Sequence, residues 1–125
     1  MILLDTSVLI YDMVGLDPNQ EYAASILSRA ELELGVAIAQ GEQVDERRRR
    51  LARLDNLFAW IPFTEATTRA YGILAQTIHA SAPAEARRID TYIAAHALEL
   101  GVPLLTANPE DFNPISHLVT ILPWR

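Results

Sequence analysis

MILLDTS, residues 1–7, opens the chain with three apolar residues, Ile2, Leu3 and Leu4, followed by Asp5 and two hydroxyl side chains. A short apolar run without polar alternation is typical of a buried strand in a parallel sheet. Asp, Ser and Thr are the residues preferred where a helix begins. We therefore expect a strand that ends at Asp5 and leads directly into a helix.

The rest of the chain alternates strand-like and helix-like segments. Ser28 as an N-cap, with Glu31 completing a capping box, predicts a helix that starts at Ser28. Further helices are expected over residues 42–58, 64–78 and 85–100, and further strands over residues 22–25, 60–63, 102–106 and 119–122. Such alternation favours a parallel sheet with helices on both faces. We predict a single domain over residues 1–125, a three-layer α/β/α fold with a mostly parallel central sheet of four to five strands.

The composition excludes several functional classes. The chain has 125 residues, no cysteine and no lysine, and its formal net charge is −6. The absence of cysteine excludes a disulfide scaffold and a thiolate zinc site, and the absence of lysine excludes Schiff-base chemistry and a P-loop. No apolar run approaches the roughly 20 residues that span a bilayer, and the N-terminus lacks the basic region of a signal peptide. We therefore expect a cytoplasmic protein that does not contact a membrane.

Two acidic residues fall on apolar faces of the predicted helices. Glu31 shares its face with Leu34 and Ile38, and Asp90 shares its face with Ile93. Both carboxylates are therefore expected to project toward the core. Burial of an isolated carboxylate is costly unless a cation or hydrogen-bonded partners are present.

Polar side chains also follow two of the predicted strands. Asp5 ends the first strand, and Asn108 and Asp111 follow the strand expected at residues 102–106. Ligands of open parallel sheets bind in the crevice beyond the carboxyl ends of the strands. We therefore expect three carboxylates, with Asn108 or Asp111, to meet in one crevice. Mg²⁺ or Mn²⁺ would offset their repulsion and activate water against a phosphodiester.

Each of these acids also has a simpler interpretation. Asp5 is explained by a helix N-cap alone, and Glu31 by the glutamate of a capping box. Asp90 lies inside its predicted helix among apolar neighbours, although Arg87 at i−3 is placed to pair with it. His96 is expected to pack or to form a hydrogen bond rather than to act as a catalytic base. The metal interpretation explains all three acids together, whereas the simpler one must be applied three times.

Four segments carry a resemblance to a known family: MILLDTSVLI (residues 1–10), SRAELELG (28–35), RIDTYIAAHA (88–97) and LTANPEDF (105–112). The sequence resembles PIN-domain ribonucleases and, among them, the VapC-type toxins of bacterial toxin–antitoxin pairs. The segments occur in the family's order over nearly the whole chain. Each alone is a weak signal, but the ordered set is specific.

The resemblance implies Mg²⁺- or Mn²⁺-dependent endonucleolytic cleavage of RNA. Asp5, Glu31 and Asp90 match the first three acidic positions of the family's site, with Asp5 and Asp90 as the principal metal ligands. Glu31 would hold a second ion or orient the attacking water. The fourth acidic position is matched by Asn108, with Asp111 three residues on, so the residue that completes the site is left open. Three hydroxyl side chains match polar positions beside the site: Thr6, Ser7 and Thr106. The resemblance also implies a VapB-like antitoxin partner and a homodimer.

Two alternatives stay open from the sequence. The four arginines at residues 47–50 are favoured as a solvated helix face balanced by neighbouring acids, and a phosphate-guiding edge for RNA is the alternative. Arg87 and Arg88, within one turn of Asp90, are better placed to contact a substrate phosphate. Because function resides in the site rather than in the fold, a non-catalytic PIN-like module that binds RNA or protein is the alternative to an enzyme, and Asn108 keeps it open.

Overall fold

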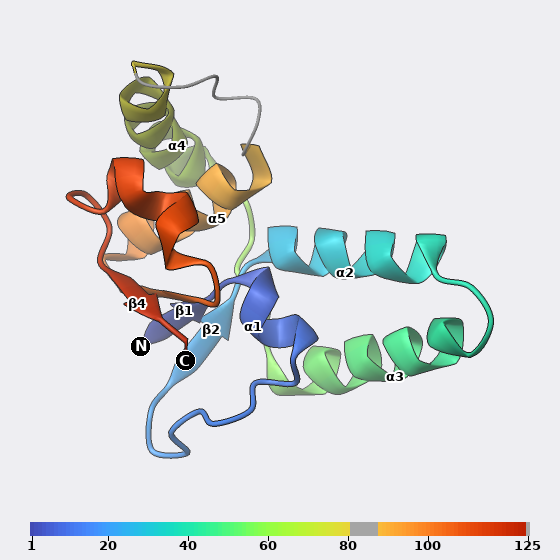
Figure 1. Cartoon of the computed structure of the whole chain (residues 1–125). Coiled ribbons are helices and arrows are strands. Elements are labelled where there is room, and N and C mark those ends of the chain that lie inside the picture. Colours follow the sequence, from blue (N-terminus) through green and yellow to red (C-terminus); the bar gives the residue numbers. More distant parts are fainter. Residues whose placement is uncertain (81–87, 125) are drawn as a thin grey trace.

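The computed structural model describes residues 1–80 and 88–124 (Figure 1). In chain order the elements are β1 (Ile2–Leu4), α1 (Thr6–Ile10), β2 (Tyr22–Ala24), α2 (Ile26–Ile38), α3 (Glu42–Leu57), α4 (Glu65–His79), α5 (Arg88–Leu100), β3 (Leu104–Thr106), the 3₁₀ helix η2 (Pro109–Ile115) and β4 (Ile121–Pro123). The expected start of the last long helix and Arg87 lie outside the described residues. Within the described ranges, no helix is both long and apolar enough to cross a membrane.

The described strands form one parallel sheet in the order β2–β1–β3–β4. β1 therefore lies in the middle, where Leu3 pairs with Ala23 of β2 and with Leu104 of β3. The pairing continues to the end of β1, because the Asp5 amide donates to the Leu105 carbonyl at 2.9 Å. Residues that follow β1 and β3 are thereby brought to the same edge of the sheet, as the sequence predicted.

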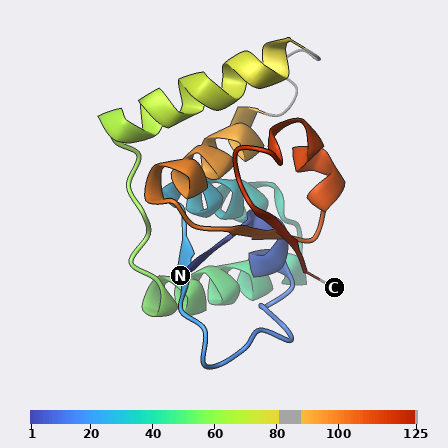
Figure 2. The same ribbon diagram turned by 90° about the vertical axis from the view of Figure 1, so that its left-hand side faces the viewer.

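Alternate residues of the central strands face opposite helical layers. Leu3 and Leu104 pack in a cluster with α4, α5 and η2, whereas Leu4 and Leu105 pack with α1, α2 and α3. Figure 2 shows α4 and α5 on one side of the strands and α3 on the other. The predicted three-layer α/β/α fold is confirmed, with four strands in the described part of the chain.

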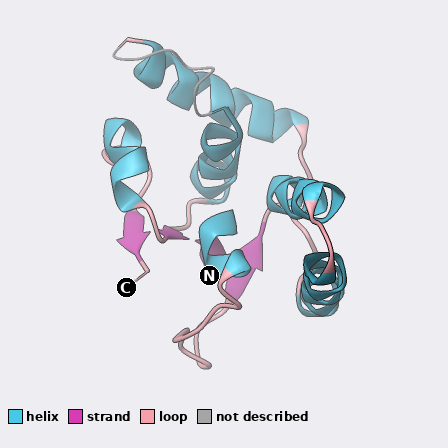
Figure 3. Ribbon diagram, turned by 45° about the vertical axis from the view of Figure 1, so that its right-hand side comes forward, coloured by secondary structure: helices cyan, strands magenta, loops and turns pink. Residues whose placement is uncertain are grey.

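α2 and α3 form an antiparallel hairpin that reaches away from the sheet (Figures 1 and 3). For this reason Leu34 and Ile38, in the outer half of α2, are 60% and 66% exposed. The buried residues of α2 are instead Ser28 and Leu32. The expectation that Glu31 lies on a buried apolar stripe with Leu34 and Ile38 is wrong, and Glu31 lies half-buried at the border of the inner face.

α2 begins one turn earlier than the sequence predicted. Ser25 is the N-cap, since its Oγ accepts a hydrogen bond from the Leu27 amide at 3.0 Å. Ser28 lies inside the helix with no exposed surface. Glu31 is therefore not the glutamate of a capping box. The two serines are three residues apart, and the end of β2 at Ala24 decides between them.

The strand predicted over residues 60–63 is reduced to a single bridge beside β2. The Ile61 amide donates to the Ala24 carbonyl, and the Ile61 carbonyl accepts from the Ile26 amide, both at 2.9 Å. The pairing cannot continue because α2 begins at Ile26, directly after Ser25, and the partner segment is then no longer extended. The predicted strand is wrong for this reason.

His96 of α5 connects the start of α2 to the bridge that follows α3. Its Nδ1 lies 2.7 Å from Ser25 Oγ and its Nε2 lies 3.2 Å from the Pro62 carbonyl. Because Ser25 Oγ already accepts from an amide, its hydroxyl donates to Nδ1, and Nε2–H donates to Pro62. Burial lowers the pKa of His96, against smaller raising effects of Glu99 and of the Pro62 carbonyl. His96 is thus a neutral hydrogen-bonding residue of the core, as expected.

The lowered pKa of His96 predicts a loss of stability on mild acidification. Near pH 6.5 the unfolded chain takes up a proton at His96 that the folded protein disfavours, so the free energy of unfolding falls as the pH drops through this range. Urea denaturation at about pH 7.5 and about pH 5.5 measures the change. We expect His96→Gln to be less stable than wild type and to lose this part of the pH dependence. The exposed His117 provides the control, because His117→Gln is expected to keep the pH dependence that His96 causes. Equal pH dependence in wild type and His96→Gln would contradict the prediction.

Candidate active site

Asp5 lies at the carboxyl end of β1 and is only 5% exposed. Its Oδ2 accepts hydrogen bonds from Ser7 Oγ and Thr106 Oγ1, each at 2.8 Å. Its Oδ1 is buried and has no hydrogen-bond partner among the described residues. The side chain makes no capping bond to α1, so the N-cap interpretation does not explain it. A buried carboxylate oxygen without a donor is costly and calls for a cation.

The two hydroxyls that bind Asp5 are themselves fixed by backbone amides. Ser7 Oγ accepts from the Ala107 amide, and Thr106 Oγ1 accepts from the Asn108 amide, each at 3.0 Å. Each hydroxyl oxygen therefore accepts from the loop after β3 and directs its hydrogen to Asp5 Oδ2. This network fixes the orientation of the carboxylate, and its members Ser7 and Thr106 are positions that the sequence singled out.

Glu31 of α2 is held beside Asp5 by Thr6. Thr6 Oγ1 donates to Glu31 Oε1 at 2.6 Å and lies 2.9 Å from Ser28 Oγ. Burial raises the pKa of Glu31, the Thr6 hydrogen bond lowers it, and the negative charge of Asp5 raises it further. Because Thr6 follows Asp5 directly in the chain, its hydrogen bond to Glu31 brings the two carboxylates to the same part of the fold, although they are on different elements.

The other predicted site residues lie at the start of η2, in η2 itself and on α5. Asn108 is exposed and precedes η2, where its carbonyl accepts from the Asp111 amide at 3.1 Å. Asp90 is half-buried in the first described turn of α5, which packs against α2 and α4. In residues 1–80 and 88–124, no group of three or more His, Asp or Glu side chains is arranged to hold a metal ion. The convergence of Asp90 with Asp5 and Glu31 thus stays a prediction, as do the metal-binding roles of Asn108 and Asp111.

The donor atoms at Asp5 and Glu31 suit a hard divalent cation. Carboxylate oxygens are the ligands that Mg²⁺ and Mn²⁺ prefer. None of the ion pairs found among the described residues involves either carboxylate. Within residues 1–80 and 88–124, two neighbouring carboxylates are thus held without an ion-pair partner, and one buried oxygen has no donor. These observations fit a metal-binding site.

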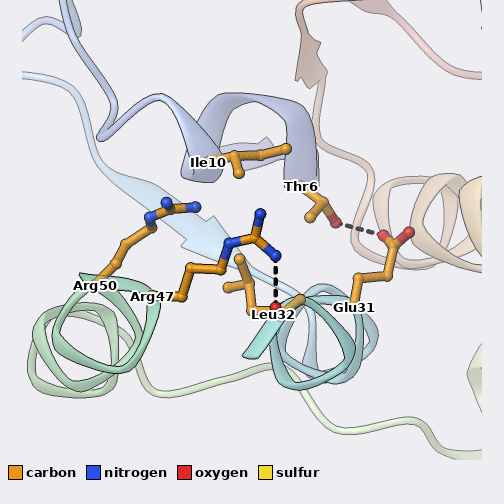
Figure 4. A pocket seen from close by; sticks show the side chains of 7 residues that line it. Thr6, Ile10, Glu31, Leu32, Arg47 and Arg50 are labelled. Carbon is orange, nitrogen blue, oxygen red and sulfur yellow. Dashed lines mark hydrogen bonds between the residues drawn. The ribbon is translucent and has the colours of Figure 1, made fainter. Parts of the chain in front are cut away.

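A pocket of about 320 Å³ opens beside Thr6 and Glu31 (Figure 4). Arg47 and Arg50 of α3 line its other side. From the sequence, Arg47 and Arg50 were not distinguished from Arg48 and Arg49. Their i, i+3 spacing nevertheless indicates that they lie on one face of the helix. Ser28, which contacts Thr6 from inside α2, was also not predicted as a site residue.

Comparisons with known proteins show the family to which the chain is related. The PIN domain family model matches residues 2–117. The chain is 32% identical to Ribonuclease VapC4 of Mycobacterium tuberculosis over 95% of each chain. It is also similar to a chain of the crystal structure of VapBC-5, a member of the VapBC family of toxin–antitoxin systems from Mycobacterium tuberculosis, with a TM-score of 0.81, 25% identity and 98% and 97% of the two chains covered. VapBC-1 from nontypeable Haemophilus influenzae gives a TM-score of 0.78 and 28% identity over 99% and 98%.

Replacement of Glu31 by glutamine is expected to stabilise the metal-free protein at neutral pH. The amide oxygen still accepts from Thr6, but the charge that burial and Asp5 disfavour is removed. Because the folded-state pKa is raised, the gain should disappear below about pH 4, where the wild-type carboxyl is protonated in both states. Thermal unfolding with a chelator measures the effect. The exposed Glu46 is the control, and an equal gain in Glu46→Gln, or no gain in Glu31→Gln, would contradict the explanation.

Proposed function

The chain belongs to the PIN domain family, and on this basis we propose that it is an endoribonuclease that hydrolyses RNA phosphodiester bonds with Mg²⁺ or Mn²⁺. The observation that carries the proposal is Asp5 Oδ1 at the carboxyl end of β1, a buried carboxylate oxygen to which none of the described residues donates. The proximity of Glu31 and the relative that bears the name ribonuclease support it.

Asp5, Asp90 and Glu31 are the proposed metal-binding residues, and Asn108 or Asp111 completes the set. When bound, the ion supplies positive charge that neutralises the phosphoryl group and lowers the pKa of water. All the proposed side-chain ligands offer oxygen, which matches the preference of Mg²⁺.

Ser7 and Thr106 act by orienting Asp5. They occupy Oδ2 with two hydrogen bonds, which leaves Oδ1 as the oxygen available for a cation. Since both hydroxyls are held by backbone amides, the carboxylate keeps this orientation before any ligand arrives. Such preorganisation reduces the cost of assembling the site when RNA binds.

Glu31 is the proposed group that orients the attacking water and takes up its proton. In the metal-free protein burial raises its pKa, the Thr6 hydrogen bond opposes this effect, and the charge of Asp5 adds to the rise. Thr6 holds Oε1, so Oε2 is the oxygen proposed to accept the proton.

The biological role that we propose is that of a toxin inhibited by a VapB-like antitoxin protein. The similar structure of VapBC-5 is described as a member of the VapBC family of toxin–antitoxin systems, VapBC-1 carries the same family name, and both likenesses cover nearly the whole chain. A homodimer is part of the same proposal. RNA is the proposed substrate, and the antitoxin would act by preventing RNA from reaching Asp5 and Glu31.

Metal binding is expected to raise the melting temperature. A ligand at about 100 times its Kd stabilises a folded protein by about 2.7 kcal/mol, which corresponds to a rise of several degrees for a domain of this size. Thermal unfolding with MgCl₂ or MnCl₂, compared with chelator, should show this rise in wild type and lose most of it in Asp5→Asn. Asp17→Asn, in an exposed turn, is expected to respond like wild type. A metal response that survives in Asp5→Asn would contradict the assignment.

RNA cleavage tests the enzymatic proposal directly. Wild-type protein is expected to cleave total RNA with Mg²⁺ or Mn²⁺ and to lose this activity with chelator. Asp5→Asn and Asp90→Asn are expected to reduce the rate by a factor of about 100 or more, since each removes a proposed metal ligand. Asp17→Asn again serves as the control, and circular dichroism establishes that the variants are folded.

The same experiment distinguishes the second candidate function. A wild-type protein that binds RNA but cleaves none with any divalent metal would be a non-catalytic PIN-like module. The observation that favours this candidate is Asn108, which stands where a fourth acid is expected and is exposed beside the site. Cleavage that is lost in Asp90→Asn would reject it.

A further inference from the structure

The four arginines at residues 47–50 do not form one uniform surface. Arg47 and Arg50 are half-buried and line the pocket beside Glu31, whereas Arg48 and Arg49 are exposed. Residues i and i+3 of a helix lie on the same face, so α3 turns one pair toward α1 and α2. The interpretation as a solvated helix face holds for the exposed pair only.

The pocket lies between α1, α2 and α3 and has a volume of about 320 Å³. Figure 4 shows Arg47 and Arg50 on one side and Thr6 and Glu31 on the other, with Ile10 of α1 above them. The pocket therefore has a basic side on α3 and an acidic side at Glu31, which Thr6, the residue after Asp5, binds.

Arg47 is fixed in the pocket by a hydrogen bond to the backbone of α2. Arg47 Nη1 donates to the Gly35 carbonyl at 2.6 Å. This carbonyl is in the last turn of α2, where the Ala39 amide bonds to Val36 instead, so Arg47 supplies its hydrogen bond. The ion pairs found in residues 1–80 and 88–124 all involve other arginines. Neither pocket arginine has a carboxylate partner in that part of the chain.

Two half-buried guanidinium groups in one pocket repel each other unless an anion lies between them. The planar guanidinium matches the geometry of a phosphate and binds it with paired hydrogen bonds. The chain as a whole carries a formal charge of −6 and would repel RNA. A local positive group beside the cleavage site offsets this repulsion.

We propose that Arg50, supported by Arg47, binds a phosphate of the RNA strand next to the phosphate that is cleaved at Asp5 and Glu31. The proposal rests on the endoribonuclease function proposed above and adds a substrate-binding subsite to it. A phosphodiester strand suits both sides of the pocket, because one phosphate would lie at the carboxylates, where the proposed cation would offset their charge, and the next would lie at the arginines. An acidic peptide would satisfy the arginines but place a further carboxylate against Glu31.

Binding of a labelled single-stranded RNA tests the subsite. The measurement uses fluorescence anisotropy with Mg²⁺ in an Asp5→Asn background, over a series of salt concentrations. Addition of Arg50→Ala is expected to weaken binding about tenfold, since a hydrogen bond to a charged group is lost. The slope of log K against log salt concentration should decrease by about 0.7, the value for one phosphate contact on a single strand. Arg50→Lys, which keeps the charge, should recover part of the affinity.

Arg48 provides the matched control, because it is on the same helix and carries the same charge but faces solvent. Arg48→Ala is expected to stay within about twofold of the parent protein in affinity. In the active protein, Arg50→Ala should raise KM and leave kcat within about twofold of wild type. Arg47→Ala should weaken RNA binding and also lower the melting temperature, since the Gly35 carbonyl loses its partner.

The outcomes separate the subsite from the enzymatic function. If the protein cleaves RNA and Arg50→Ala equals Arg48→Ala in affinity and KM, the subsite is rejected and the endoribonuclease stands. If RNA binds through Arg50 but no divalent metal gives cleavage, the enzymatic proposal is rejected and the phosphate-binding role of Arg50 stands. If RNA neither binds nor is cleaved, both are rejected.

Discussion

Asp5 is buried at the end of the central strand with one carboxylate oxygen bound by two hydroxyls and the other without any donor among the described residues. A negative charge in this position is tolerable only if neighbouring dipoles and a cation offset the loss of hydration. The hydroxyls of Ser7 and Thr106 supply the dipoles, and they can do so because β1 and β3 are adjacent and end at the same edge. The site can therefore form only because the strand order of the sheet places β1 beside β3.

The helical hairpin of α2 and α3 contributes the site residues that do not lie at the edge of the sheet. Its inner end carries Glu31 next to Asp5, and α3 returns with Arg47 and Arg50 on the side that faces α1. An acidic group and a basic group are thereby held on opposite sides of one pocket without neutralising each other. A protein of net negative charge can attract a nucleic acid strand only through such a local separation of charge.

The predicted and observed secondary-structure elements differ where the local sequence fits two arrangements equally well. Tertiary contacts then determine which arrangement forms. Ser25 and Ser28 are both good N-caps, and the bridge between Ser25 and Ile61 places the helix start at the first. The prediction that Glu31 shares a buried face with Leu34 and Ile38 was wrong, because the outer part of α2 has no sheet beneath it. Propensity and periodicity describe a helix by itself, whereas burial depends on what the helix packs against.

The sequence by itself determined the strand–helix alternation, the parallel sheet, the placement of Asp5 and Asn108 at strand ends, and the resemblance to the PIN domain family. These features follow from local patterns, in which each residue type restricts the backbone or the face on which it can lie. Only the tertiary structure decided which oxygen of Asp5 has no donor, that Thr6 holds Glu31, and which arginines of residues 47–50 line the pocket. The physical reason is that these facts depend on the relative position of segments far apart in the chain, which hydrogen bonding and packing across the sheet fix and which no local pattern encodes.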